Sequence, residues 1–497
     1  MNFVIIMTDT QRKDMVGAYG VSEVDTPSLD RLASEGIRFE RAYTACPLCT
    51  PARGALFTGL HPQVNGAICN NVSPHKDIAV MGTIFSHYGY RSVYTGKWHL
   101  DGSNYLGDGT PDGGFDPEWW YDKKNFLMER RREGAPRGGS LQTAADLRAA
   151  GITLTSLQGH RVASRAVDFL ENVQEGEDFI LVVSFDEPHG PFLAPPAYWE
   201  MFDASPLSEP PNYNAPVDDK PELHRVQRRE NGEIPWREYS ATAGVCKYFG
   251  CNSYIDREIG RVLDAVDARH RDDTTVLYTS DHGDQLRAHG LLSKGPMMYE
   301  ETCNIPFIVR YPGGPEGVVS NALVSHVDLI PTMLDTLGIA APEMLPGVSI
   351  LPILAGDLDA RPRSHAMVSF HRFAINGDAV GGFYPVRCIT DGKLKLVINL
   401  LETDELYDLE LDPYEMRNRI ADSEYQARRD ALHDELMDRM DRMRDPFRGP
   451  VWGIREWRQA RKKSYRPQNG VGRDKPQGFP FQPQIMPQSE TSIRKQG

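Results

Sequence analysis

Short apolar runs that end in polar residues alternate with amphipathic stretches over the first two thirds of the chain. Apolar runs of this length are typical of strands that are buried on both faces of a sheet. The predicted strands are 3–7, 91–94, 179–185, 275–280 and 307–311, and the predicted helices are 26–33, 159–172, 241–270 and 328–337. This alternation predicts an α/β fold with a large mixed, mainly parallel sheet sandwiched by helices.

The pattern changes after about residue 362. Three short strands follow one another closely and then a helix, at 367–370, 386–389, 394–400 and 423–442. They predict a smaller C-terminal α+β subdomain over 363–445, which leaves 1–362 as the catalytic domain. Residues 446–497 show no core pattern, so we predict an extended C-terminal tail that wraps the main domain or pairs with a neighbouring molecule.

Two regions of the large domain lack a clear period. Residues 101–150 are rich in Gly, Asp and Arg, and we predict an insertion or long loop beside the active site, where substrate specificity tends to reside. Residues 206–239 are polar and rich in proline, which predicts an excursion over the surface.

Composition narrows the class of protein. The chain of 497 residues is 40% hydrophobic, with no stretch as long and apolar as a membrane span and no basic region at its N-terminus. Seven cysteines without a framework spacing favour a reducing compartment, so we expect a cytoplasmic protein. The net charge of −14 argues against nucleic acid as a partner but not against an anionic substrate held in a local basic pocket.

Polar side chains follow three of the predicted strands. Asp9 follows the first, Glu187 and His189 follow the third, and Asp281 and His282 follow the fourth. We expect them to meet, because ligands bind at the C-terminal ends of strands in open α/β sheets. Mainly oxygen ligands with one histidine suit Ca²⁺, Mg²⁺ or Mn²⁺. Taken singly, Asp-His-Gly is equally typical of a turn with a capping aspartate.

The most specific motif is Cys49-Thr-Pro-Ala-Arg53, followed by Gly-Ala-Leu-Phe-Thr-Gly. If 52–57 starts a helix, the Arg53 guanidinium and the first free N–H groups surround the Cys49 side chain. The motif then forms an anion site that contains a nucleophile. An isolated cysteine is more often a buried thiol, and Cys46 lacks Pro and Arg at the matching spacing.

These residues resemble the signature of the type I, formylglycine-dependent sulfatases of the alkaline phosphatase superfamily. The chain is most similar to cytoplasmic bacterial sulfatases related to the sulfoglucosamine sulfohydrolase and sulfated-glycan group. The resemblance extends from Asp9 to 404–418, which resembles the C-terminal sulfatase signature and which we interpret as a structural strand and turn. It implies an alkaline phosphatase-like fold.

The resemblance also implies that Cys49 is a precursor. A formylglycine-generating or anaerobic sulfatase-maturating enzyme would oxidise it to formylglycine. One hydroxyl of the hydrated aldehyde would attack the ester, and the second would let the sulfated intermediate collapse and expel sulfate.

A divalent cation is implied as well, with Ca²⁺ favoured over Mg²⁺ and Mn²⁺. Its implied ligands are Asp9, Cys49, Asp281 and His282. The chain departs from the commonest sulfatase pattern, since Asp9-Thr10-Gln11 stands where many members have two adjacent aspartates. Thr10 and Gln11 are therefore both candidates for a further neutral oxygen. Asp281-His282 in place of Asp-Asn is similar to phosphonate monoester hydrolases and choline sulfatases.

The implied catalytic residues are Cys49, Arg53, Lys97, His99, His189 and Lys294. With the metal ion, Arg53, Lys97 and Lys294 would stabilise the sulfate oxygens. His189 would protonate the departing oxygen, with Lys294 as the competing acid, and His99 would act as the base in the collapse step. Singly, each of these lysines is more often a solvated surface group.

Candidate substrate contacts are Asp101, Glu187, His371 and Arg372. The acids suit sugar hydroxyls, and Arg372 suits a uronate or a second sulfate. A structural salt bridge or a solvated side chain is the alternative for each.

These features together predict a sulfuric ester hydrolase that acts on a small sulfated carbohydrate or related organic sulfate. One alternative is a phosphonate or phosphate mono- or diester hydrolase of the same superfamily. Another is a sulfoglycan-binding protein in which Cys49 is not converted. We expect no membrane partner, and a homo-oligomer is compatible with the sequence.

Overall fold

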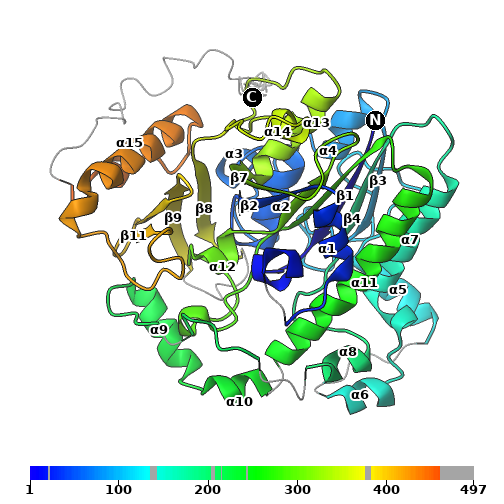
Figure 1. Cartoon of the computed structure of the whole chain (residues 1–497), viewed down its shortest axis with the longest axis horizontal. Coiled ribbons are helices and arrows are strands. Elements are labelled where there is room, and N and C mark those ends of the chain that lie inside the picture. The colour runs from blue at the N-terminus through cyan, green and yellow to red at the C-terminus, as the bar shows by residue number, and fades with distance from the viewer. Residues whose placement is uncertain are drawn as a thin grey trace, which may run out of the picture.

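The computed structural model describes residues 1–20, 23–134, 141, 143–202, 207–213, 215–241, 244–374 and 382–458. Two units lie side by side (Figure 1): a larger one built on a seven-stranded sheet and a smaller one built on a four-stranded sheet with helix α15. The predicted fold class, a mainly parallel sheet with helices and a C-terminal antiparallel subdomain, is confirmed.

The large sheet has the strand order β3-β4-β1-β5-β6-β2-β7. Its strands are β1 Asn2–Thr8, β2 Ile37–Tyr43, β3 Arg91–Gly96, β4 Phe179–Ser184, β5 Thr274–Ser280, β6 Phe307–Arg310 and β7 Val318–Ser325. β6 is antiparallel to both of its neighbours, and all other pairs are parallel. The C-terminal ends of β3, β4, β1 and β5 therefore meet at one edge, which is where the predicted site residues follow.

Alternate residues of the strands serve two cores. Val4 and Ile6 of β1 pack with one set of helices, α1 Pro27–Ser34, α7 Gln158–Asn172 and α11 Val245–Arg269. Phe3, Ile5 and Met7 pack with the other set, α2 Cys49–Thr58, α4 Met81–Ser86, α13 Leu329–Thr336 and α14 Leu351–Leu354. Because both faces are covered, β1 reads as a continuous apolar run.

The small unit is an antiparallel sheet of order β11-β10-β9-β8. Its strands are β8 Ala366–Arg372, β9 Phe383–Thr390, β10 Leu394–Asn399 and β11 Glu405–Asp408. Helix α15, Gln426–Arg442, packs on one face through Leu436 and Met440. Trp452 of α16, Pro450–Gly453, joins this cluster, so the first residues of the predicted tail pack on the subdomain. The rest of the predicted tail, 459–497, lies outside the described residues.

The two regions without a period contain short helices that the sequence did not predict. α5 Lys123–Arg132 and α6 Ala144–Ala149 lie within 101–150, and each begins with a capping box, Asp122 with Asn125 and Thr143 with Asp146. The caps fix where each helix begins, and one apolar residue of each, Phe126 and Leu147, packs on the core of the large unit. The other short helices are α3 Pro62–Asn65, α8 Pro196–Glu200, α9 Glu222–Asn231, α10 Trp236–Ala241 and α12 Glu300–Cys303.

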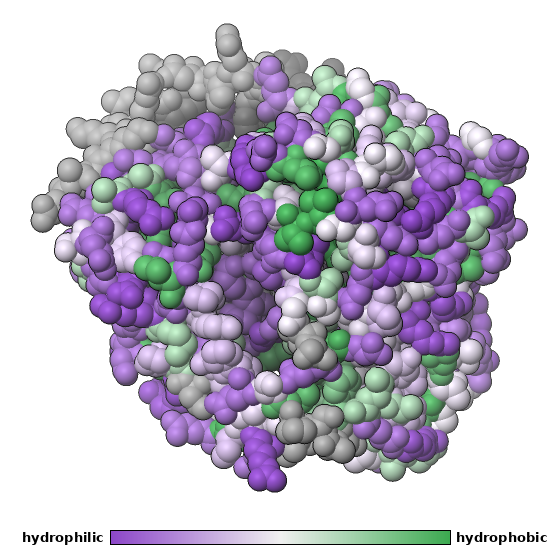
Figure 2. Space-filling view, viewed as in Figure 1, coloured by the Kyte–Doolittle hydropathy of each residue, from purple (hydrophilic) through white to green (hydrophobic). Residues whose placement is uncertain are grey.

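Within the described residues, none of the helices has both the length and the apolar character needed to cross a bilayer. All seven cysteines of the chain fall in this part, each is buried, and no disulfide joins any of them within the described residues. Figure 2 shows that hydrophilic residues cover most of the face seen in Figure 1, with hydrophobic ones in small scattered groups.

A buried ion cluster joins the small sheet to α12. The fully buried Lys395 of β10 lies 3.0 Å from Glu300 and 2.5 Å from Glu415. Replacing Lys395 by methionine leaves both carboxylates without their cation, so we expect the free energy of unfolding in urea to fall by about 3–5 kcal/mol. Lys393→Met is the matched control, because Lys393 pairs with Glu410 and both side chains are about half exposed. Equal losses in the two variants would contradict the prediction.

Candidate active site

Four buried side chains converge at the C-terminal edge of the large sheet. Asp9 follows β1, Asp281 and His282 follow the adjacent strand β5, and Cys49 begins α2. One carboxylate oxygen of each aspartate, a ring nitrogen of His282 and Cys49 Sγ all lie within 4.8 Å of one another. Cys49 is only 2% exposed and the other three are fully buried. The parallel pairing of β1 with β5 therefore assembles this group, which we call the acidic cluster.

The acidic cluster fits a divalent cation. Burial and the charge of Asp9 raise the pKa of Asp281 to about 7, as expected when two carboxylates share a dry site. A divalent cation would relieve this repulsion. His282 Nδ1 lies 2.8 Å from the Gly283 carbonyl oxygen, so Nδ1 carries a hydrogen, and with a cation bound Nε2 would present its lone pair to the acidic cluster. This is the usual arrangement of a histidine that binds a metal ion.

Thr10, and not Gln11, reaches the acidic cluster. Thr10 Oγ1 lies 2.6 Å from Asp9 Oδ1 and 3.1 Å from Lys294 Nζ. Gln11 Oε1 instead accepts from the Tyr278 hydroxyl and from Thr8 Oγ1, the latter at 3.3 Å, and its Nε2 donates to Asn252 Oδ1 at 2.6 Å. Of the two candidates for an additional neutral oxygen ligand, Thr10 is therefore the one in position.

Arg53 ties the carboxylates of the acidic cluster to the strands. Its Nε donates to Asp281 Oδ2 and one Nη to Asp9 Oδ2, both at 3.0 Å. Its other Nη donates to the Lys97 carbonyl oxygen at 2.7 Å and to Ser184 Oγ at 2.8 Å. Most of the guanidinium N–H groups are thus committed to protein acceptors. The geometry makes Arg53 a positioning residue, and its predicted contact with sulfate stays a prediction.

Two lysines surround the Cys49 sulfur. Lys294 Nζ lies 3.1 Å and Lys97 Nζ 4.0 Å from Sγ. Lys97 Nζ also lies 2.6 Å from Asp9 Oδ2. Burial and the charge of Asp9 oppose ionisation of the Cys49 thiol, but Lys294, Lys97 and His282 outweigh them and hold its pKa well below the ordinary value. The position of residue 49 is therefore an anion site.

Two histidines flank the acidic cluster. His99 Nε2 lies 2.9 Å from Asn71 Oδ1, and its buried Nδ1 has no hydrogen-bond partner among the described residues. Burial lowers the pKa of His99, so its ring is neutral near pH 7 and Nδ1 is able to accept a proton. His189 is 25% exposed, with Nδ1 at 2.8 Å from the Gly190 carbonyl oxygen and Nε2 at 4.0 Å from Asp9 Oδ1. It therefore presents Nε2 at the opening of the site.

Three residues beside the acidic cluster, Asp186, Tyr105 and Lys123, were not singled out from the sequence. Asp186, directly after β4, accepts from the Tyr105 hydroxyl and from Lys123 Nζ, the latter at 2.5 Å, and lies 3.3 Å from Lys97 Nζ. The Tyr105 ring lies under Lys97 Nζ at 4.2 Å. The sequence offered one clue to Asp186, because it directly follows a predicted strand. Tyr105 and Lys123 belong to the region without a period, which does lie beside the site.

The predicted substrate contacts are engaged elsewhere. Asp101 accepts hydrogen bonds from two backbone N–H groups of its own loop, at 3.0 and 2.9 Å. His371 is buried within β8, where it lies 2.9 Å from an Arg387 nitrogen. Arg372 is half-buried at the end of the same strand. The roles of these residues, and of Glu187, as substrate contacts stay predictions.

Glu187 turns into the core instead of facing the acidic cluster. Its Oε1 accepts from the Gly159 N–H at 3.0 Å, and its buried Oε2 has no partner among the residues that the structure describes. Burial and the charge of Asp186 raise the pKa of Glu187 from 4.5 to about 7.

The raised pKa of Glu187 predicts a pH dependence of stability. Because the folded state keeps this proton between pH 4.5 and about 7, stability should fall as the pH rises through that window and level off above it. Glu187→Gln mimics the protonated acid and should remove about 3 kcal/mol of that fall, measured by urea unfolding at pH 5 and pH 8. The exposed Glu171→Gln is the control, and an unchanged fall in Glu187→Gln would refute the assignment.

Comparison with known proteins gives a consistent picture. Residues 1–339 match the family model described as Sulfatase, and 288–442 match the model described as N-sulphoglucosamine sulphohydrolase, C-terminal. The chain is 41% identical over 499 residues to the uncharacterized sulfatase YidJ of Escherichia coli (strain K12), covering 97% of each. It is 26% identical over 513 residues to an N-acetylglucosamine-6-O-sulfatase of Bacteroides thetaiotaomicron, covering 89% of this chain and 87% of that one.

A solved structure shares the fold. The structure of BT4656 in complex with its substrate D-Glucosamine-2-N, 6-O-disulfate matches with a TM-score of 0.72 at 22% identity. The match covers 90% of this chain and 98% of that chain. At this level of identity the likeness concerns the fold alone.

Proposed function

Because this chain belongs to the sulfatase family of the alkaline phosphatase superfamily, we propose that it acts through a formylglycine formed from Cys49 and through one divalent cation. The protein is an enzyme that hydrolyses sulfate esters. The observation that carries the proposal is the convergence of Cys49 with two lysines and the acidic cluster in one buried site. Asp9, Asp281, His282 and residue 49 would hold the cation, with Ca²⁺ favoured by the oxygen-rich donor set.

Residue 49 and the cation would supply the nucleophile and part of the charge stabilisation. A hydrated formylglycine offers an attacking hydroxyl, and a bound divalent cation offers a Lewis acid for a sulfate oxygen. Lys97 and Lys294, which surround residue 49, would bind the peripheral oxygens, where charge develops during transfer. Arg53 keeps both aspartates in position for this task.

The two histidines suit opposite proton transfers. With Nδ1 held by the Gly190 carbonyl oxygen, His189 presents Nε2 at the opening, where the departing alcohol leaves. Lys294 lies deeper, beside Cys49, which favours His189 over Lys294 as the acid. His99 has an available Nδ1 and an Nε2 oriented by Asn71, which favours it as the base.

For the substrate we propose a small sulfated carbohydrate. The name of the Bacteroides thetaiotaomicron relative and the disulfated glucosamine bound to BT4656 support a sulfated amino sugar. A maturation enzyme for Cys49 and a cytoplasmic location complete the proposal. The cysteines form no disulfide within the described residues, which supports that location.

Two measurements on the purified protein test this proposal. Conversion of Cys49 lowers the intact mass by two hydrogens and by the difference between sulfur and oxygen. The converted protein should hydrolyse p-nitrophenyl sulfate faster than p-nitrophenyl phosphonate esters. A phosphonate preference would establish the phosphonate hydrolase instead, and an unconverted native protein that binds sulfated glycans without turnover would establish the binding protein.

A further inference from the structure

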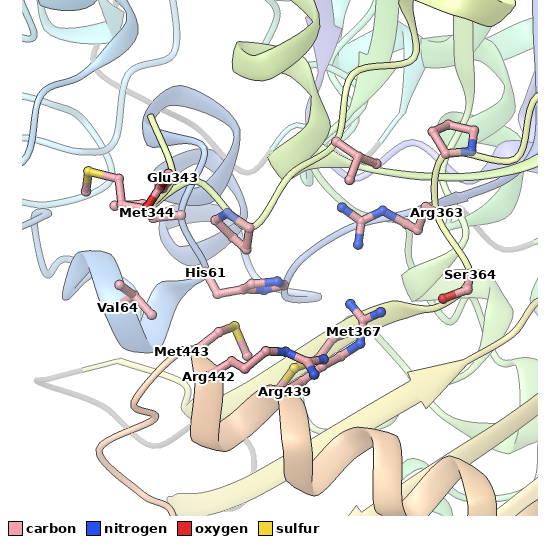
Figure 3. A pocket seen from close by; sticks show the side chains of 14 residues that line it. His61, Val64, Glu343, Met344, Arg363, Ser364, Met367, Arg439, Arg442 and Met443 are labelled. Atoms are coloured by element: carbon pink, nitrogen blue, oxygen red, sulfur yellow. The ribbon is translucent and has the colours of Figure 1, made fainter. Parts of the chain in front are cut away.

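Apart from the active site, a cavity of about 420 Å³ lies between the two units (Figure 3). Its walls come from residues just after α2, from 343–348, from the linker at 362–364 and from the C-terminal end of α15. Cys49 begins α2, whereas Leu60 and His61, which follow the other end of that helix, line the cavity. A helix of this length spans about 15 Å. The cavity is therefore separate from the active site.

One side of the cavity is strongly positive. Arg363 lines it from the linker, and Arg439 and Arg442 line it from the last turn of α15. Part of this positive charge has a structural role, because cationic side chains in the last turn of a helix stabilise its C-terminus. Arg439 and Arg442 share a single carboxylate, Glu435, at 2.7 and 3.1 Å.

The remaining charged groups of the lining are one arginine and one acid. Arg363 is matched by Asp328, with Nε at 2.9 Å from Oδ2. The one acid of the described lining, Glu343, is exposed. The described lining therefore carries three arginines and a single, exposed acid.

His61 adds an unpaired polar atom to the same wall. The residue is 3% exposed, and its buried Nδ1 has no hydrogen-bond partner among the described residues. Figure 3 shows its ring lying between the sticks of Arg363 and Arg439. Burial and the charges of Arg363 and Arg439 lower the pKa of His61 to about 3, so the ring is neutral. Because Nδ1 itself is buried, His61 contributes a neutral ring to this wall, and the arginines are its charged groups.

The opposite side of the cavity is apolar. It is lined by Leu60, Val64, Met344, Pro346, Val348, Met367 and Met443. The volume lies within the range of roughly 300–1,000 Å³ that is usual for small-molecule sites. An inorganic oxyanion alone would leave most of this apolar lining in contact with water.

We propose that this cavity binds a small organic anion. Its acid group lies at Arg439 and Arg442, and its apolar body packs against Met344 and Met367. No residue of the acidic cluster is among the described residues that line the cavity, so binding there is independent of the catalytic mechanism.

The fluorescent aromatic sulfonate 8-anilinonaphthalene-1-sulfonate is a suitable probe, since it joins one anionic group to an apolar body. The wild-type enzyme should bind it at one saturable site. Arg439→Met should weaken binding roughly 10- to 100-fold, because a charged hydrogen bond in a dry site is lost. Arg428→Met is the matched control, an exposed arginine of the same helix.

Two further variants complete the test. Ser364→Trp fills the cavity from an exposed position of its rim without changing a charge, and should also weaken binding. Lys294→Met weakens the anion site at Cys49 and should leave binding unchanged. Wild-type affinity in both Arg439→Met and Ser364→Trp, loss of binding in Lys294→Met alone, or no saturable binding would each overturn the proposal.

Discussion

Replacing Cys49 by alanine should lower kcat for sulfate ester hydrolysis by about 10⁴-fold or more, which is the scale of losing a nucleophile. Lys97 and Lys294 remain in place, so KM should change much less than kcat. The measurement is the steady-state hydrolysis of p-nitrophenyl sulfate by the purified variant.

Cys46→Ala is the control for this substitution. Cys46 lies three residues earlier and is equally buried, but it packs in an apolar cluster with Tyr43 and Met298. This variant should lose some stability and keep its kcat. Undiminished turnover by Cys49→Ala, or an equal loss of kcat in both variants, would rule out residue 49 as the nucleophile.

Replacing Arg53 by lysine should lower kcat by roughly 10²–10³-fold although the charge is kept. Arg53 donates to two carboxylates, a carbonyl and a hydroxyl from one planar group, and an ammonium lacks that fork. Asp9 and Asp281 then lose their common brace. We also expect the free energy of unfolding in urea to fall by about 1–3 kcal/mol per buried acceptor left unpaired.

Arg31→Lys is the matched control for Arg53→Lys. Arg31 pairs with Asp264 on the surface, where both side chains are more than one third exposed. Its replacement should leave kcat unchanged and stability within about 0.5 kcal/mol of the wild type. An Arg53→Lys enzyme with the kcat of the wild type would show that the fork is not required.

In the large sheet, the strands that were predicted from the sequence are mainly those buried by helices on both faces. The observed β1, β4 and β5 are buried at every residue, which produces the continuous apolar runs. β2 and β7 were missed because they lie toward one edge of the sheet, where charged and polar residues such as Arg38, Glu40 and Asn321 interrupt the run. The alternation Ile-Arg-Phe-Glu at the start of β2 is typical of a half-buried strand, so this strand carried a signal that a search for continuous apolar runs overlooks.

The sequence predicted those residues of the active site that belong to a recognisable motif or directly follow a predicted strand. The ends of β1 and β5 and the Cys49 motif specified the four members of the acidic cluster, which the structure brings together. After β4 the chain offers two adjacent acids, Asp186 and Glu187, and neighbouring side chains point to opposite sides. Sequence alone does not tell which one faces the site. Tyr105 and Lys123 were not predictable, because caps and loop contacts fix their segment.

Because α2 is buried in the folded protein, any enzyme that modifies Cys49 would have to act before folding is complete. Every residue from Cys49 to Thr58 is buried in the finished fold, so the proposed maturation enzyme would have to reach this segment on a chain that is still being synthesised or has not yet folded. More than two hundred residues separate Cys49 from His282, and ribosomes need on the order of 10–50 seconds to add them. During that interval β5 does not yet exist to close over the thiol. If Cys49 is modified as proposed, a host without the modifying enzyme at this moment would yield a folded protein that keeps the unmodified thiol.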